Sequence, residues 1–133
     1  MLMASNGSPA HKNKHFSQSL RHALHGVGSA LKRERNLRFD LFASVVVIIA
    51  GFWLQVTRRD WLWLVLAMIS VIAAELANSV VEALVRLQVG PDFDSDPLIG
   101  RLLNMAAGFV LVIGIGAALI GVLVFWPYLF GGK

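Results

Sequence analysis

The chain is organised around one stretch, Ala74-Glu75-Leu76-Ala77-Asn78-Ser79-Val80-Val81-Glu82. This stretch directly follows the apolar run from Trp61 to Ala73. Neither segment contains proline or glycine, so both belong to one predicted helix. The polar side chains of the stretch stand three or four residues apart and share one helix face: Glu75, Asn78, Ser79 and Glu82. Two carboxylates and an amide are costly to bury on a hydrophobic helix unless a cation binds them. This polar face is therefore a candidate functional site.

The composition predicts a membrane protein. Of the 133 residues, 56% are hydrophobic and 15% are charged, and the mean hydropathy is +0.66, which is too apolar for a soluble domain of this size. The absence of cysteine excludes disulfides, thiolate metal sites and thiol nucleophiles. The net charge is +4, but no interleaving of basic and aromatic residues supports nucleic-acid binding, so we expect no nucleic-acid partner.

The apolar pattern predicts an all-α membrane protein with three transmembrane helices and an amino-terminal amphipathic helix. Residues 1–14 are interpreted as a disordered polar tail, and residues 15–126 as a single membrane domain followed by a short tail, 127–133. Within the domain, residues 15–33 form an interfacial helix with an apolar stripe and a cationic face. The predicted spans are about 37–56, 61–89 and 98–126, and a loop containing Gly90-Pro91 and residues 92–97 separates the last two.

The distribution of basic residues predicts the orientation in the membrane. With the amino terminus inside, nine Lys and Arg residues lie on the inner side and three on the outer side. The positive-inside rule then places the amino terminus and the loop after Val89 in the cytoplasm. We accordingly expect an inner-membrane location with the active site on the cytoplasmic side. The polar and charged residues expected to converge there are Glu34, Asp40, Glu75, Glu82, Arg86, Arg101 and Asn104.

The oxygen ligands on this side favour a hard cation. Mg²⁺ is usually held by one or two carboxylates together with substrate phosphates, and Glu34 and Glu82 are the natural pair near the headgroups. Glu75 lies deeper, two turns from Glu82, where desolvation suits a general base. A base at the apolar boundary beside a metal-nucleotide suggests phosphoryl transfer to a lipid hydroxyl.

Two motifs in this sequence resemble a known family. Glu34-Arg35-Asn36-x-Arg38 precedes the first span, and Ala74-Glu75-x-x-Asn78-Ser79-x-x-Glu82 lies in the second. Both resemble signatures of the small bacterial diacylglycerol kinases, whose close relatives phosphorylate undecaprenol. Gly100-Arg101 and Met105-Ala106-Ala107-Gly108 resemble the start of the family's third span, so the likeness covers roughly His15 to Trp126.

The resemblance implies a fold, an activity and roles for particular residues. It implies a homotrimer with active sites shared between protomers, acting on a lipid acceptor with ATP as co-substrate and Mg²⁺. Glu75 would match the catalytic base, and Glu34 and Glu82 the metal-binding carboxylates. The residues expected to bind nucleotide or substrate are Asn78, Arg38, Arg86, Gly100 and Asn104.

The sequence departs from the family pattern around the nucleotide site. Arg86 stands where relatives usually carry an aspartate, and Leu103-Asn104 replaces lysine-aspartate. Losing that lysine removes a positive charge from the phosphates, and we hypothesise that Arg86, which is four residues after Glu82, replaces it. The alternative is that Arg86 only pairs with Glu82 or reaches toward the headgroups.

Other interpretations stay open at this point. A non-catalytic member of the same fold, acting in lipid binding or as a scaffold, is the second reading, and a small ion conduit lined by Glu75 and Glu82 is the third. Glu75 as a structural ion-pair partner is the plain alternative to a catalytic role. The histidines His15, His22 and His25 share one face with metal-like spacing, but that face is solvated and cationic, which favours contact with headgroups.

Overall fold

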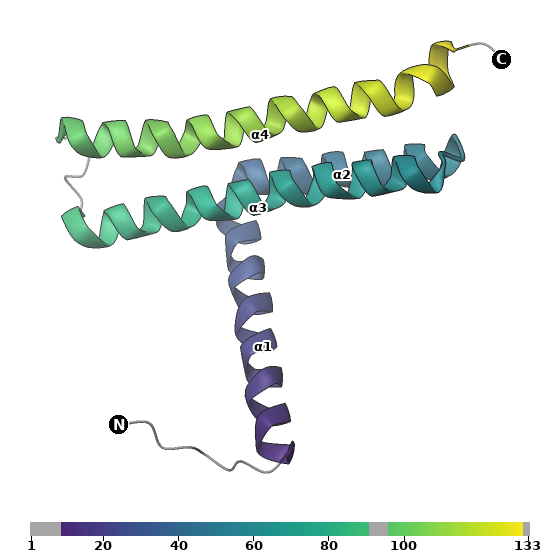
Figure 1. The fold of residues 1–133 in the computed structure, drawn as a ribbon. Helices are drawn as coiled ribbons and strands as arrows, with labels where there is room; N and C mark the ends of the chain where they lie inside the picture. Colours follow the sequence, from purple (N-terminus) through teal and green to yellow (C-terminus); the bar gives the residue numbers. More distant parts are fainter. Residues whose placement is uncertain (1–8, 91–95, 132–133) are drawn as a thin grey trace. The chain divides into compact units, whose positions relative to one another are not determined.

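The computed structural model describes residues 9–90 and 96–131 as four α-helices (Figure 1). Residues 1–33 and residues 34–133 form two separate units, so each is described by itself. The all-α prediction is confirmed, because the described residues contain helices and no strand. The first eight residues of the predicted tail, and residues 91–95 of the predicted loop, lie outside the described residues.

The first unit contains the helix α1, Pro9–Arg33. It begins six residues before the predicted start at residue 15, because the composition of that segment is polar but holds no helix breaker after Pro9. Proline suits the first turn of a helix, where its missing N–H has no intrahelical partner. Phe16, Leu20 and Leu24 of the apolar stripe are all exposed.

The second unit begins at Glu34 and contains the three long apolar helices. Helix α2 is Arg35–Trp53 and helix α3 is Arg58–Val89. Helix α2 starts two residues before and ends three residues before its predicted limits, and a short turn follows in which Gln55 has a φ of 51°. Thr57 then caps α3, and its Oγ1 accepts a 3.2 Å hydrogen bond from the Asp60 main-chain N–H.

Helix α3 ends at Gly90, whose φ of 74° is readily adopted by glycine. Helix α4, Pro97–Phe130, is capped by Asp96, which accepts a 2.9 Å hydrogen bond from the Leu98 N–H. It continues through Pro127, four residues past the predicted end at residue 126. The added turn remains helical because the Pro127 carbonyl still accepts a 3.0 Å bond from the Gly131 N–H.

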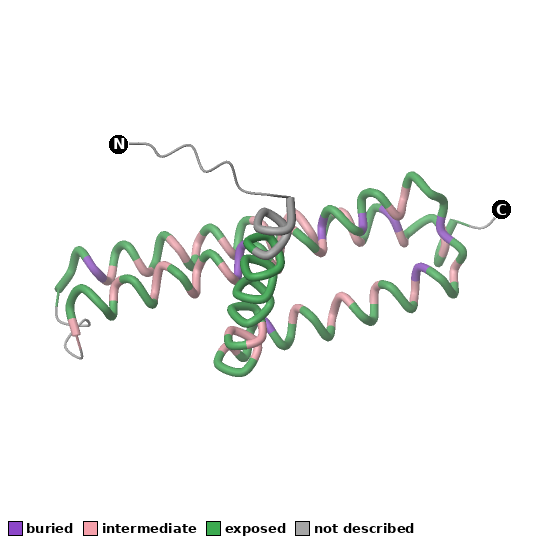
Figure 2. Tube along the Cα trace, turned by 90° about the horizontal axis from the view of Figure 1, so that it is seen from below, coloured by how far each residue is buried: buried purple, intermediate pink, exposed green. Residues whose placement is uncertain are grey.

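Helices α3 and α4 pack side by side in antiparallel directions, and α2 packs against α3 (Figures 1 and 2). The buried core of this unit centres on Val56, Leu64 and Val124, with Trp61 and Ile120 packed around it. Most other large apolar side chains are exposed, and much of the tube in Figure 2 has the green of exposed residues. Such exposure is expected where lipid or another protein covers a helix.

Each of the three helices in the second unit is long and apolar enough to cross a membrane. Helix α3 has 32 residues and α4 has 34. At 1.5 Å per residue, each is therefore longer than the hydrocarbon core of a bilayer, which is about 30 Å thick. The part of α3 beyond Glu82 and the first turns of α4 can therefore extend to the bilayer surface.

Candidate functional site

Glu75 is buried within helix α3, and it is the only buried charged side chain in the described part of the chain. Glu75 is only 7% exposed, and the neighbouring Ala74 is 3% exposed. A carboxylate in this setting has lost most of its contact with solvent. Such burial is unfavourable unless the carboxylate has a binding partner or a function. The position predicted from the sequence as the catalytic base is thus also the position where the protein encloses a carboxylate.

One helical turn further along α3, Asn78 and Glu82 are hydrogen-bonded to each other. The Asn78 Nδ2 donates to Glu82 Oε1 at 3.2 Å, which orients both side chains on the face they share with Glu75. The Oδ1 of Asn78 is buried and accepts no hydrogen bond from the described residues. A buried acceptor without a donor is uncommon in proteins and indicates a missing partner such as a cation or a substrate group.

Ser79 has a different role from its polar neighbours. Its Oγ donates a 3.1 Å hydrogen bond to the Glu75 main-chain carbonyl, one turn earlier. This contact satisfies the hydroxyl inside the helix, as is common for serine in apolar helices. The Ser79 hydroxyl therefore bonds to the main chain of its own helix.

Helix α2 brings two further carboxylates to this face of α3. Glu34 and Asp40 both lie within electrostatic interaction range of Glu75, as does Glu82. Glu34 is the N-cap residue of α2, but its side chain makes no capping hydrogen bond to the helix. The tertiary structure therefore gathers the three carboxylates predicted from the sequence, Glu34, Glu75 and Glu82, and adds Asp40.

Asp40 is the site residue that sequence reasoning left out of the predicted set. Its Oδ2 is buried and has no hydrogen-bond partner among the described residues, while its main-chain carbonyl accepts a 2.9 Å bond from Ser44 Oγ. A signal was present in the sequence: Asp40 is an acidic residue directly before the apolar run that begins at Leu41. Its sequence position places it on the cytoplasmic side, but its proximity to Glu75 depends on the packing of α2 against α3.

The donor set fits Mg²⁺ delivered together with a nucleotide. The described residues contain no group of three His, Cys, Asp or Glu side chains that could hold a metal ion alone. Mg²⁺ commonly uses only one or two carboxylates and takes its other ligands from phosphates and water. Glu82, with the unpartnered Asn78 Oδ1 beside it and Glu34 on α2, offers oxygen donors of the kind this ion prefers.

The remaining predicted residues lie at the ends of the helices. Arg38, Arg86 and Asn104 expose their side chains, and Gly100 is half-buried in the first turn of α4. The Gly100 N–H donates a 3.2 Å hydrogen bond to the Asp96 carbonyl. Because α3 and α4 run antiparallel, Arg86 and Asn104 are at the same end of this helix pair. Their roles toward a nucleotide stay predictions.

An apolar groove opens between the three long helices and has a volume of about 740 Å³. Residues of α2, α3 and α4 line it, and they include Asp40, Ser44, Met68, Gly114, Phe125 and Phe130. Asp40 therefore belongs both to the carboxylate cluster and to the lining of the groove. The groove offers room for a hydrocarbon chain next to the buried acidic face of the helices.

Comparison with known proteins assigns the chain to a family. Residues 21–125 match the sequence pattern of the prokaryotic diacylglycerol kinase family. An undecaprenol kinase of Bacillus subtilis (strain 168) is 31% identical over 124 residues, covering 92% of this chain and 98% of the relative. A diacylglycerol kinase of Synechocystis sp. is 34% identical over 103 residues, covering 77% of this chain and 58% of the relative.

A third relative, a diacylglycerol kinase of Haemophilus influenzae, is 32% identical over 71 residues, covering 53% of this chain and 60% of the relative. The family match includes both motifs singled out in the sequence, one beginning at Glu34 and one containing Glu75. Together with its three helices of membrane-spanning length, this shows that the chain is an integral membrane protein. It belongs to the prokaryotic diacylglycerol kinase family.

Proposed function

We propose that this protein is a lipid kinase that transfers the γ-phosphate of ATP to the hydroxyl of a membrane lipid, either undecaprenol or diacylglycerol. The observation that carries the proposal is the burial of Glu75 beside the hydrogen-bonded pair Asn78–Glu82 on a helix of membrane-spanning length. Membership of the family and the kinase names of its relatives support the same chemistry.

In this proposal Glu75 is the general base. Its carboxylate accepts the proton of the lipid hydroxyl while the hydroxyl oxygen attacks the γ-phosphorus of ATP, and the bond to the β-phosphate oxygen breaks to release ADP. A carboxylate next to the hydrocarbon region is well placed for this role, because the acceptor hydroxyl lies at the boundary between headgroups and lipid chains. Asp40, which also lines the groove, would help to orient that hydroxyl.

Glu82 and Glu34 would hold Mg²⁺ together with the phosphates of the nucleotide. When bound, the ion neutralises charge that builds up on the phosphates during transfer. Asn78 would keep Glu82 in position through its Nδ2 and present its unpartnered Oδ1 to the same site. The expected contributions of Arg38, Arg86, Gly100 and Asn104 are to bind the nucleotide or the substrate.

Two observations bear on the acceptor. The relative of which the match covers 98% is named an undecaprenol kinase. The groove is lined mainly by apolar side chains over residues as far apart as Phe39 and Phe130, which suits a long hydrocarbon chain. Undecaprenol is therefore the first lipid to test, and diacylglycerol is the second.

The test is transfer of radiolabel from [γ-³²P]ATP to each lipid by the purified protein in mixed micelles. We expect labelled lipid phosphate, and we expect Glu75→Gln to lower the rate by about 10²–10⁴-fold, the usual contribution of a general base. Ser79→Ala is the matched control on the same helix, because its hydroxyl contacts only the main chain in the structure. If the wild-type protein labels neither lipid, the kinase proposal fails.

A non-catalytic relative that binds lipid or acts as a scaffold is the second candidate. It is favoured by the replacement of the family's nucleotide-site residues by Arg86, Leu103 and Asn104. It predicts that lipid binds to the purified protein while no phosphate is transferred. An ion conduit has less support, because the carboxylates near Glu75 are all expected toward the cytoplasmic side, with no partner expected halfway across the membrane.

We also propose a homotrimer in the bacterial inner membrane, with the amino terminus and the carboxylate cluster facing the cytoplasm. The exposed apolar side chains of α2, α3 and α4 provide surface for contacts between copies. In α4, Gly114 and Ala118 are four residues apart, a spacing that allows close helix contact. Cross-linking in native membranes tests the trimer, and protease accessibility of an amino-terminal tag in sealed vesicles tests the orientation.

A further inference from the structure

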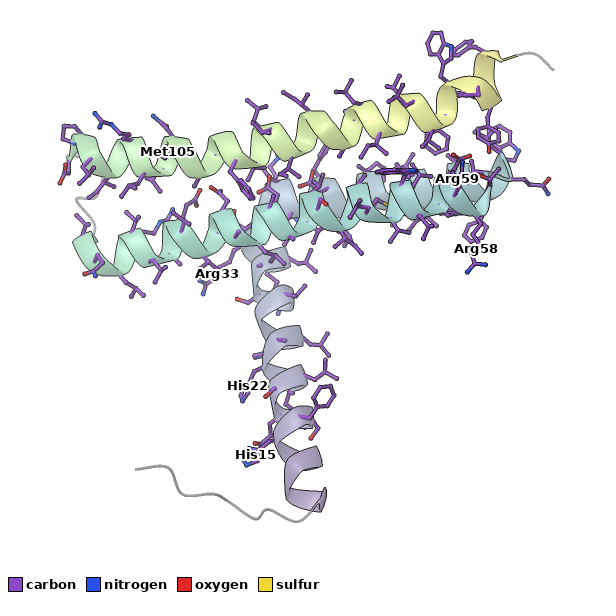
Figure 3. All side chains as sticks on the ribbon, in the orientation of Figure 1. His15, His22, Arg33, Arg58, Arg59 and Met105 are labelled. Atoms are coloured by element: carbon purple, nitrogen blue, oxygen red, sulfur yellow. The ribbon has the colours of Figure 1, made fainter. Side chains whose placement is uncertain are left out.

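Helix α1 carries three exposed histidines on one side. His15, His22 and His25 are separated by seven and three residues, and these spacings place them on one face of an α-helix. Figure 3 shows His15 and His22 pointing to the same side of α1. The kinase mechanism proposed above does not use these side chains, so their clustering needs a separate explanation.

The opposite side of α1 is apolar and exposed. Phe16 is 71% exposed, Leu20 is 50% exposed and Leu24 is 64% exposed, and the three are spaced by four residues along one stripe. A helix with an apolar stripe and a charged face is suited to the surface of a bilayer, with the stripe directed into the lipid. The apolar side therefore indicates a lipid surface as the partner.

The charge of α1 indicates which kind of lipid. From Pro9 to Arg33 the helix contains no Asp or Glu. The charged side chains described on it are all cationic: Arg21, Lys32 and Arg33. A helix with charge of one sign is attracted to a bilayer that carries the opposite sign, and each cationic residue near an anionic surface strengthens binding.

Connectivity supplies the second argument. Helix α1 ends at Arg33, and α2, which can span the membrane, begins at Arg35. One residue between them tethers the end of α1 to the start of a span, which raises the effective concentration of α1 at the bilayer surface. Weak attraction between α1 and lipid is therefore enough to govern its position.

We propose that α1 binds anionic phospholipid, and that its histidines make this binding stronger as the pH falls. Histidine is neutral above its ordinary titration range and cationic below it, a change that occurs between about pH 8 and pH 5. Protonation of His15, His22 and His25 adds positive charge to a face that has no acidic residue to offset it. Attraction to anionic lipid consequently rises at low pH and falls at high pH.

The size of the effect follows from the surface potential of an anionic membrane. A single cationic residue near such a surface strengthens binding by roughly 1 kcal/mol, or about fivefold. The histidines lie opposite the apolar stripe and thus farther from the lipid, so the combined effect of three is expected to be about tenfold rather than the full product. Added salt should reduce the effect by screening.

The absence of cysteine from the chain allows a single-label experiment on the whole protein. A nitroxide on Ala23→Cys, at the edge of the apolar stripe, reports immersion through its accessibility to oxygen and to a water-soluble nickel chelate. The full chain is placed in nanodiscs of phosphatidylglycerol or of phosphatidylcholine. From pH 8 to pH 5.5, we expect the ratio of immersed to water-exposed label to rise about tenfold in phosphatidylglycerol and to stay constant in phosphatidylcholine.

The combined variant His15→Gln, His22→Gln and His25→Gln should remove the pH response. Gln18→Ala with Ser29→Ala, changes on the same helix that alter no titratable group, should keep it. The proposal is overturned by an equal pH response in both lipids, by a response that survives in the histidine variant, or by none in phosphatidylglycerol. The readout does not depend on phosphoryl transfer, so it is separate from the test of kinase activity.

Discussion

The phenol of Tyr128 donates a 2.5 Å hydrogen bond to Asp60 Oδ2 and so connects residues that are 68 positions apart in the sequence. The same phenol oxygen accepts a 3.1 Å hydrogen bond from the Thr57 N–H. These contacts join the last turns of α4 to the start of α3, at the end of the unit opposite the α3–α4 connection. They depend on the continuation of α4 past Pro127, since Tyr128 lies in the added turn.

Tyr128→Phe is expected to lower the free energy of unfolding by about 1–2 kcal/mol, because it removes a hydrogen bond to a carboxylate and leaves the ring in place. Thermal unfolding in detergent, followed by circular dichroism, measures the change. Asp60→Asn and the double variant complete a cycle that isolates the pair. Strict additivity of the two single changes would show that this hydrogen bond does not stabilise the protein.

Gly51→Ala is expected to destabilise the contact between α2 and the start of α3. A Cβ at Gly51 would lie 2.6 Å from the Trp61 ring, which already packs against Phe52 with ring centroids 4.9 Å apart. Shifting this ring should cost about 1–3 kcal/mol, reduced by up to about 1 kcal/mol from the better helix propensity of alanine. Gly116→Ala is the matched control, because a Cβ there meets no atom of the chain within 4 Å. Equal melting temperatures for the two variants would contradict this.

Glu82→Gln is expected to raise the concentration of Mg²⁺ needed for half-maximal phosphorylation by about 10–100-fold, the usual effect of weakening a metal site. The substitution keeps the size of the side chain and the hydrogen-bonding oxygen that Asn78 contacts, but it removes the negative charge. The measurement is the rate of lipid phosphorylation against free Mg²⁺ at saturating ATP. A metal dependence identical to that of the wild type would remove Glu82 from the proposed site.

Arg86→Ala is expected to raise KM for ATP by about tenfold while changing kcat less, because a lost charge–phosphate contact weakens binding by roughly 1–2 kcal/mol. Arg86→Lys should restore most of the loss if the positive charge is what matters. The measurement is a series of initial rates at varied ATP with the acceptor lipid fixed. An unchanged KM in the alanine variant would mean that Arg86 does not replace the family's lysine.

Much of the carboxylate site could be predicted from the sequence because its main elements lie on one helix. Glu75, Asn78 and Glu82 are three or four residues apart, and the period of an α-helix alone places them on one face. The bond between Asn78 and Glu82 is a local contact of this kind. Asp40 could not be assigned in the same way, since its relation to Glu75 depends on how α2 meets α3.

The ends of the helices also differ in whether local sequence or tertiary contacts set them. The stop at Gly90 was predictable, because glycine followed by proline ends a helix for local reasons. The passage of α4 through Pro127 was not, because proline in most contexts breaks a helix. Here the added turn places Tyr128 against Asp60 and Thr57, and these tertiary contacts favour the continued helix.

The three apolar helices, the polar face from Glu75 to Glu82 and the cationic amphipathic character of α1 follow from local sequence, since hydrophobicity and helical period are local properties of the chain. Three relationships come instead from the tertiary structure: Glu34 and Asp40 lie near Glu75, Asp40 lines an apolar groove, and Tyr128 bonds to Asp60 at the start of α3. These relationships join residues on different helices, and the packing that creates them cannot be read from the spacing within any one helix. The polar face from Glu75 to Glu82 is thus a candidate site in the sequence alone, and the packing of α2 beside it adds Glu34 and Asp40.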